Sequence, residues 1–449
     1  MRSWTLERSV VAVLLLCLAC ALAQPLAVNN SSGPGPGERF EVLFGVPVQW
    51  YKSPFDPRPA HMALPENSRG LDFLNVDCCM RCRGTGKDIY RQSGCPGDPF
   101  GRPYTYPPLL TCLFYWIFLL NTAQAAALWS WAVLGLIFAN ACFWFYAKGF
   151  RPGGENGGLI LKRPFLLALL FTASYPSIFA FERGNHDVWV LLFVSGLAWC
   201  LARQRWLAAG LTASLAALVK VYPFLLLIPL IAFCAAALLL WLGFRKTVLL
   251  DAGFKMLLGA GLGLAAGIGV FYEPTVEYAT RMLPMLAKLK LTDPANLFSH
   301  SLPAAFGSAG TLGFACLWGV GTFALVLFLV RWILNSEKGG RGNVALAFSY
   351  LGALMVYLAN TSYDYNLIML IPLLACWMSH PRTHQDPLAT TGILLLLLGA
   401  ALPRWIQPAC AGSLKFSFYL ALQCAGWSLI GLRLLILAAS ETVSALKPD

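Results

Sequence analysis

Four short polar motifs interrupt an otherwise apolar chain, and each carries groups that could bind a ligand or move a proton. Residues 184–187 read Gly-Asn-His-Asp, and residues 220–223 read Lys-Val-Tyr-Pro. The third motif, Asn-Leu-Phe-Ser-His, ends at His300, and the fourth, Ser-Tyr-Asp-Tyr-Asn, ends at Asn366. Ionisable groups at the edge of a bilayer are costly, so motifs that gather on one face mark a functional site by default.

Two further carboxylates, Asp72 and Asp77, lie in the segment 70–80, just before a glycine-rich turn, and we expect this segment to be a loop. A carboxylate in a partly dry pocket can have a raised pKa and can accept a proton from a hydroxyl nucleophile. The alternative is that each aspartate has no role in catalysis and either caps a helix or is a solvated acid in a loop. The sequence therefore predicts a general base here without choosing between the two residues.

Several cations in or beside the motifs could contact a phosphate or a sugar; they are Arg183, His186, Lys220 and His300. Lys220 ends an apolar run just before a Tyr-Pro turn. It either snorkels to the membrane surface or neutralises a bound phosphate. Asp187 and Asp364 either bind a sugar hydroxyl or cap a helix.

Composition indicates the class of protein that must position these groups. The chain has 449 residues, of which 58% are hydrophobic and 12% charged, about half the usual charged share. Apolar runs near 20 residues span a bilayer, and without water their backbone must be helical. We therefore expect an all-α polytopic membrane protein with membrane lipids around it.

The net charge of +12 is spread over short loops. That pattern fits topology signals and anionic headgroups and excludes nucleic acid as a partner. The sequence has no P-loop and no room for a Rossmann-like nucleotide domain. We expect no cofactor and no metal ion.

The chain divides into four segments. Residues 1–23 are a first transmembrane helix or a cleaved signal, 24–106 a large extracytoplasmic loop, 107–437 the multi-helix domain and 438–449 a short cytoplasmic tail. The expected apolar runs lie at 107–121, 124–147, 164–181, 187–202, 205–219, 222–243, 253–272, 311–332, 344–360, 366–379, 388–404 and 414–437.

Basic loops set the expected orientation, because cytoplasmic loops are enriched in Lys and Arg. Four basic clusters can all be cytoplasmic if the spans alternate, with about twelve crossings and both termini inside. Residues 107–147 must then cross an odd number of times, so that 107–121 is a re-entrant or tilted half-helix. All four polar motifs then share the outer side with the 24–106 loop. The clusters are Lys148 to Arg163, Arg203 with Arg205, Arg245 to Lys255, and Arg331 to Arg341.

Four of the 14 cysteines lie in the outer loop and outside the apolar runs; they are Cys78, Cys79, Cys82 and Cys95. The adjacent pair is poor spacing for a zinc knuckle. One or two disulfides in an oxidising compartment is the preferred interpretation.

Three segments resemble polyprenyl-phosphate-dependent glycosyltransferases of family 87. Residues 86–109, Gly-Lys-Asp-Ile-Tyr-Arg to Pro-Tyr-Thr-Tyr-Pro-Pro-Leu, resemble the first outer loop of that family. Residues 182–223, with Glu-Arg-Gly-Asn, then Ala-Gly-Leu and Lys-Val-Tyr-Pro, are similar to its Gly-Gln/Asn-x-Asn/Asp and Lys-x-x-Pro pattern. Residues 362–366 look like its late outer motif. The chain departs from the family in its Cys-rich outer loop and its long lead-in before Asp72.

The resemblance implies a GT-C fold with an active site at the non-cytoplasmic face and a lipid-phosphate sugar as donor. Family members resemble inverting mannosyltransferases that need no metal ion and use an Asp of the first outer loop as base. By position that residue is Asp72, with Asp77 as runner-up. The implied donor-phosphate ligands are Lys220, Arg183 and His300, and the implied sugar or acceptor ligands are Asn185, Asp187, Tyr222, Asp364 and Asn366.

The acceptor implied is a lipid-linked or cell-envelope glycan or glycolipid, in a bacterial inner membrane or, in a eukaryote, the endoplasmic reticulum. Other classes stay open. A secondary transporter should show acidic groups in mid-span and broken helices, whereas these motifs lie at helix ends. A glycan polymerase, a flippase or a non-catalytic scaffold is the third possibility.

Overall fold

The computed structural model describes most of the chain, and every regular element within the described residues is helical. This confirms the all-α prediction, as expected where the backbone must satisfy its own hydrogen bonds. The described residues are 10–15, 71–84, 89–90, 104–146, 164–288, 301–335, 340–358, 364–380, 382–383, 386–401 and 414–446.

Among these residues, five helices are long and apolar enough to cross a membrane. They are α4 (Thr122–Tyr146), α9 (Leu227–Phe244, preceded by η5, Tyr222–Leu226), α10 (Thr247–Val270), α13 (Leu302–Asn335) and α17 (Leu414–Leu446). Shorter apolar helices pack among them: α7 (Asp187–Ala202), α8 (Trp206–Val219), α14 (Gly340–Leu354), α15 (Leu370–Ser379) and α16 (Pro387–Ala401). The predicted count of twelve crossings is not confirmed.

Two of the expected apolar runs are broken. Residues 107–121 form only α3 (Leu109–Cys112) and η2 (Tyr115–Leu119). The single helix expected over 164–181 is wrong, because the run divides into α5 (Pro164–Thr172) and α6 (Tyr175–Arg183). Pro176 has no N–H with which to bond the carbonyl of Thr172 and continue the helix. Ser177 Oγ donates to the carbonyl oxygen of Phe171 across the break, at 2.8 Å.

Close packing of small residues fixes α8 against α10. A Cβ at Gly259 of α10 would lie 2.0 Å from the carbonyl oxygen of Leu207, and one at Gly210 of α8 would lie 1.9 Å from that of Met256. Only glycine permits this approach, which is typical of helices packed within a membrane. The position of Lys220, directly after α8, is set by this contact.

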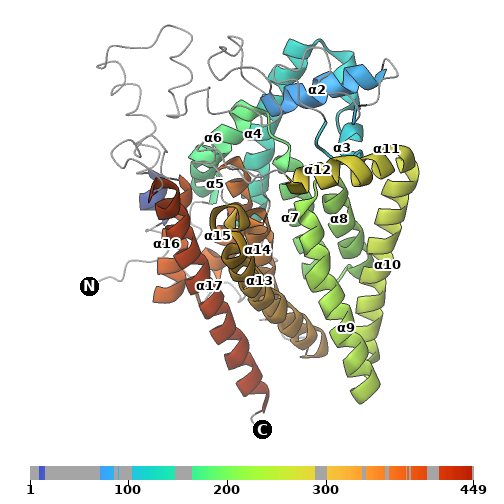
Figure 1. Cartoon of the computed structure of the whole chain (residues 1–449). Coiled ribbons are helices and arrows are strands. Elements are labelled where there is room, and N and C mark those ends of the chain that lie inside the picture. The colour runs from blue at the N-terminus through green and yellow to red at the C-terminus, as the bar shows by residue number, and fades with distance from the viewer. Residues whose placement is uncertain are drawn as a thin grey trace.

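The bundle has two chemically different ends. Figure 1 shows α2 (Leu71–Gly84), α11 (Tyr272–Glu277) and α12 (Leu283–Lys288) across the upper end. The α9–α10 connection and the C-terminus lie at the lower end. Helix α8 joins the ends, since Lys220 follows its last residue while Trp206, its first, contacts Trp332 of α13. Fourteen residues of helix separate these contacts by about 21 Å.

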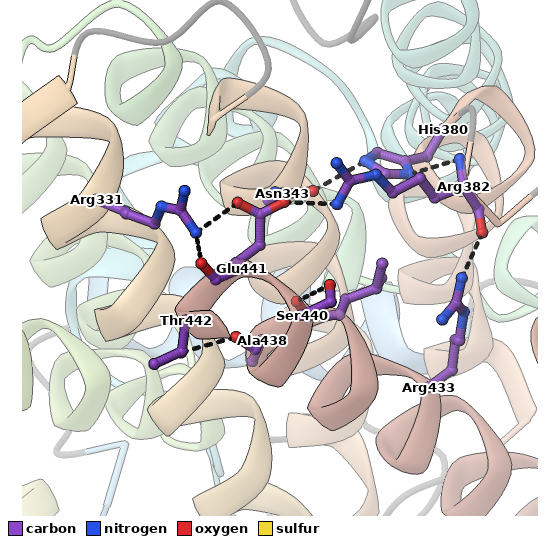
Figure 2. A network of polar contacts seen from close by, with 10 residues as sticks. Arg331, Asn343, His380, Arg382, Arg433, Ala438, Ser440, Glu441 and Thr442 are labelled. Atoms are coloured by element: carbon purple, nitrogen blue, oxygen red, sulfur yellow. Dashed lines mark hydrogen bonds and ion pairs between the residues drawn. The ribbon is translucent and has the colours of Figure 1, made fainter. Parts of the chain in front are cut away.

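A charged network at the lower end binds α17 to its neighbours (Figure 2). Glu441 of α17 pairs with Arg331 of α13 at 2.9 Å and with Arg382, in the turn before α16, at 2.6 Å. One further pair joins Arg433 of α17 to Asp386 at 2.9 Å. We call these five residues the α17 network. Its pairs link three parts of the bundle that are far apart in sequence.

Candidate active site

The Gly-Asn-His-Asp motif forms the turn between α6 and α7. Gly184 ends α6 with φ 60° and ψ 44°, a left-handed conformation that glycine adopts without steric cost. Asn185 N then donates to Ala180 O at 2.9 Å, and Trp129 Nε1 of α4 donates to Gly184 O at 2.9 Å. The turn is therefore held at the upper end of the bundle by α4.

Asp72 lies against this turn. It is in the first turn of helix α2 and is 3% exposed, so the expectation of a loop carboxylate is wrong. Arg183 donates to its Oδ1 at 2.7 Å, and Asn185 Nδ2 donates to its Oδ2 at 3.0 Å. His186 Nε2 lies 3.1 Å from the backbone oxygen of Asp72. Residue 183 at the end of α6 and residues 185 and 186 of the motif thus all contact one residue of a distant helix.

Asp187 forms a second ion pair beside the first. Lys220 Nζ lies 2.7 Å from its Oδ1, and the Tyr222 hydroxyl donates to the same oxygen at 2.6 Å. The Asp187 residue is fully buried. Its Oδ2 is also buried and makes no hydrogen bond with the residues that the structure describes. That oxygen can accept a hydrogen bond from a ligand hydroxyl.

Asn185 connects the two ion pairs. Its Nδ2 donates to Asp72, and its Oδ1 accepts from the backbone N–H of Asp187 at 2.7 Å. Both ends of the amide are therefore engaged within the protein. The four charged side chains, taken together, carry no net charge: they are Asp72, Arg183, Asp187 and Lys220.

Lys220 does not extend toward solvent as a snorkelling lysine would. Its side chain is 13% exposed and is directed at Asp187. The Nζ atom also lies 5.5 Å from the ring centre of Tyr106 and 5.9 Å from that of Tyr222, within the range of cation–π attraction. The ammonium is thus held between one carboxylate and two aromatic faces.

Aromatic rings enclose the turn on its inner side. The His186 ring lies 5.1 Å from Tyr106 and 5.0 Å from Phe114, centre to centre. Tyr104 packs on Tyr106, and burial raises the pKa of Tyr104 well above its usual value, with Tyr90 adding to the effect. The Tyr104 hydroxyl stays protonated at working pH, so it is not a base.

Asp77 is also helical, and its contacts differ from those of Asp72. It pairs with Arg81 at 3.0 Å and accepts a hydrogen bond from Thr122 Oγ1 at 2.8 Å. Arg81 Nη2 in turn donates to the carbonyl oxygens of Ile117 and Leu120, at 3.2 and 2.9 Å. This clamp fastens α2 to η2 and to the start of α4.

The remaining candidates are placed only in part. His300 lies outside the described residues, and for Asp364 and Asn366 the structure describes the backbone alone, in η9 (Asp364–Met369). This short helix packs against α6, which carries Arg183. Cys78, Cys79 and Cys82 are buried on α2, and Cys95 lies outside the described residues, so the disulfides stay a prediction.

Sequence reasoning gave no role to three residues that shape the site: Tyr106, Trp129 and Thr122. Tyr106 belongs to the Tyr-Thr-Tyr-Pro-Pro segment, whose aromatic density was the available signal. No comparable pattern marks Trp129 or Thr122. Within the described residues, no group of three His, Cys, Asp or Glu is placed to hold a metal ion.

These features define a membrane-embedded protein with a polar, charge-paired site at one end of a helical bundle. The model of glycosyltransferase family 87 matches residues 104–361, more than half of the chain, and the chain therefore belongs to that family. It is a membrane glycosyltransferase. The match includes Arg183, Asp187 and Lys220, and it begins after Asp72. No curated protein matches the chain.

Proposed function

We propose that this enzyme transfers a hexose, specifically mannose, from a polyprenyl-phosphate sugar to a lipid-linked or cell-envelope glycan or glycolipid acceptor. The observation that carries the proposal is the position of Asp72, a buried carboxylate held by Arg183 and Asn185 beside the Asp187–Lys220 pair. A lipid donor reaches such a site laterally from the bilayer, so a nucleotide-binding domain is not required.

The proposed reaction is an inverting displacement. The acceptor oxygen attacks the anomeric carbon and forms the new glycosidic bond, while the bond from that carbon to the phosphate oxygen breaks. The polyprenyl phosphate leaves with the electron pair, and Asp72 accepts the proton of the acceptor hydroxyl. The cations then stabilise the charge that develops on the leaving phosphate.

Each of the two cations is already paired with a carboxylate at 2.7 Å, so a donor phosphate must either displace that carboxylate or share the cation with it. In the proposal, the donor phosphate draws Arg183 away from Asp72 and shares Lys220 with Asp187; His300 is the third candidate ligand. Displacing Arg183 frees the Oδ1 atom of Asp72, which Arg183 otherwise occupies. That oxygen can then accept the proton of the acceptor hydroxyl once the donor is bound.

The sugar is assigned to the groups that border these pairs. The Oδ2 of Asp187, which makes no hydrogen bond among the described residues, is a suitable acceptor for a sugar hydroxyl, with Tyr222 beside it. Asp364 and Asn366 are proposed to orient further hydroxyls, supported by the packing of η9 on α6. For Asn185 the contacts favour a positioning role rather than the expected ligand role, since both ends of its amide are engaged.

We place the reaction at the non-cytoplasmic face of a bacterial inner membrane, or of the endoplasmic reticulum membrane in a eukaryote. Support comes from the distribution of charge. Arg205 and Arg341 contact Trp199 and Trp332 at the end opposite Lys220, and arginine-rich loops are typical of the cytoplasmic side.

Two matched variants test the base. Asp72→Asn and Asp77→Asn each remove a buried carboxylate that pairs with an arginine, and both lie on α2. With purified protein and radiolabelled polyprenyl-phosphate mannose, Asp72→Asn should lower turnover by about 10²–10⁴-fold. Asp77→Asn should keep most of its turnover per folded molecule. Size-exclusion chromatography measures the fraction of each variant that is folded.

If the Asp77→Asn variant is inactive and the Asp72→Asn variant is active, then Asp77 and not Asp72 is the base. The donor class is tested in the same assay with polyprenyl-phosphate glucose and with a nucleotide-activated mannose. Transfer from the nucleotide sugar alone would overturn the lipid donor, and transfer from the glucose donor alone would overturn mannose.

A further inference from the structure

Helix α10 is followed by a helical segment that runs across the upper end of the bundle (Figure 1). The segment consists of α11 (Tyr272–Glu277), the π-helical turn η6 (Tyr278–Met282) and α12 (Leu283–Lys288). We call it the α11–α12 segment. None of its residues was assigned a role in the site described above. Its surface divides into a protein-facing, an apolar and a charged part.

One face of this segment packs on the protein. Tyr278 is 6% exposed and Met282 is 2% exposed. The Tyr278 ring lies 5.7 Å from Tyr90, and its hydroxyl donates to Thr105 O at 3.4 Å. Thr105 precedes Tyr106, which contacts Lys220. The segment is thus in contact with the loop that lines the candidate active site.

A second face is apolar and uncovered within the described structure. Tyr272 is 65%, Val276 41% and Leu283 39% exposed. The first two are spaced by four residues, the spacing that places side chains on one face of a helix. A third set, Glu273 and Arg281, is charged and exposed. The segment therefore separates a protein-facing, an apolar and a charged surface.

The apolar face continues the lateral surface of α10. Helix α10 is a candidate membrane span, with Leu262 54% and Val270 74% exposed. Phe271, at φ −122° and ψ 40°, separates the end of this span from the start of α11. The chain therefore passes from a lipid-facing helix directly into the exposed apolar residues of the segment.

Local sequence explains the break within the segment. Pro284 has no N–H and cannot form the helical bond to the carbonyl of Thr280. The α-helix gives way to the π turn before this proline and resumes as α12. The backbone stays helical from α11 through η6 into α12, and Tyr278 and Met282 stay inward.

We propose that the α11–α12 segment lies in the membrane interface, with Tyr272, Val276 and Leu283 at the boundary of headgroups and acyl chains. Glu273 and Arg281 then face water. A helix with an apolar and a charged face, joined to a span, is suited to lie in the interface plane. Its charged face carries both signs, so apolar burial rather than attraction to anionic lipid holds it there.

Spin labels can test this in the full-length protein. Single cysteines replace Val276, Leu283 and Arg281 in turn, in a background in which the accessible native cysteines are serine, and the protein is reconstituted in phosphatidylcholine vesicles. Leu262→Cys on α10 is the reference for a lipid-exposed site. Power saturation compares access of oxygen, which enriches in lipid, with access of a water-soluble nickel chelate.

Labels at 276 and 283 should be several-fold more accessible to oxygen than to the chelate, as at 262, and the label at 281 should show the reverse. Greater access of the chelate at both 276 and 283 would place the face in water and overturn the proposal. Low access of both reagents at 276 and 283 would show a protein contact, from a second copy or from another part of the chain, and would overturn it equally. None of these outcomes depends on the activity of the enzyme.

Discussion

The charged networks at the two ends of the bundle use their carboxylates differently. In the α17 network, Glu441 gives one oxygen to Arg331 and the other to Arg382 (Figure 2). At the candidate active site, Lys220 and Tyr222 both contact the Oδ1 atom of Asp187. Its Oδ2 atom makes no hydrogen bond among the described residues. Glu441 is therefore paired through both carboxylate oxygens, whereas the described part of the chain leaves one oxygen of Asp187 as an open acceptor.

Burial separates the two networks mainly at their carboxylates. The side chains of Asp187 and Asp72 are 0% and 5% exposed, whereas those of Glu441 and Asp386 are 11% and 18% exposed. A buried ion pair is costly to form, and apolar residues of similar size would often give a more stable protein. The lower network is explained by fastening α17. The upper one is placed where stability alone would not require charge, which is typical of a site that binds charged ligands.

The largest contrast should come from Lys220→Gln. The change leaves Asp187 buried without its cation, which costs about 3–5 kcal/mol of stability. If Lys220 binds the donor phosphate, loss of that contact costs a further 1.5–3 kcal/mol, or roughly one to two decades in donor affinity or turnover. Thermal melting and donor titration on purified protein measure the two effects separately.

The control for Lys220→Gln is the double variant Asp187→Asn/Lys220→Gln, which removes both charges. It should regain most of the stability and none of the donor affinity. Normal donor affinity in the double variant would make Lys220 only a counter-ion of Asp187. The phosphate site would then move to Arg183 or His300.

Glu441→Gln should lower stability and leave turnover nearly unchanged, in contrast to Lys220→Gln, which should lower both. Removing the charge weakens two ion pairs of the α17 network, one of which is half exposed. We expect a loss of about 2 kcal/mol, between the values for exposed and buried pairs, seen as a lower melting temperature. Turnover of the folded fraction should stay within about twofold. Asp251→Asn breaks the exposed pair with Lys255 and should change neither quantity. A tenfold loss of turnover in Glu441→Gln would show that the two ends are coupled.

Thr122→Val tests the clamp on α2 and should have a smaller effect than Glu441→Gln. It removes one hydrogen bond to Asp77 and keeps the shape of the side chain. The expected cost is about 1 kcal/mol, with transfer reduced by less than about twofold, because Arg81 still holds Asp77. A tenfold loss of transfer without a change in melting would show that the clamp sets the position of Asp72.

Apolar periodicity located most helices but not the elements between them. The run expected at 187–202 coincides with α7, and that at 205–219 differs from α8 by one residue. The helix α2 was missed because its polar residues suggested a loop. Its signal was the helical spacing of Phe73, Val76 and Met80, which are all buried in a helix that the protein covers on nearly every side.

The sequence by itself determined the class of protein, the family and the polar positions at the ends of apolar runs, because hydropathy reports which residues can lie in a bilayer and where a span must end. Hydropathy indicates how deep in the membrane a residue lies, and it does not indicate which helices are neighbours within the membrane plane. The pairing of Asp72 with Arg183, and of Asp187 with Lys220, joins residues whose helices meet only in the folded bundle. Only the tertiary structure decided which carboxylate touches which cation, since that depends on how α2, α6, α7 and α8 pack together.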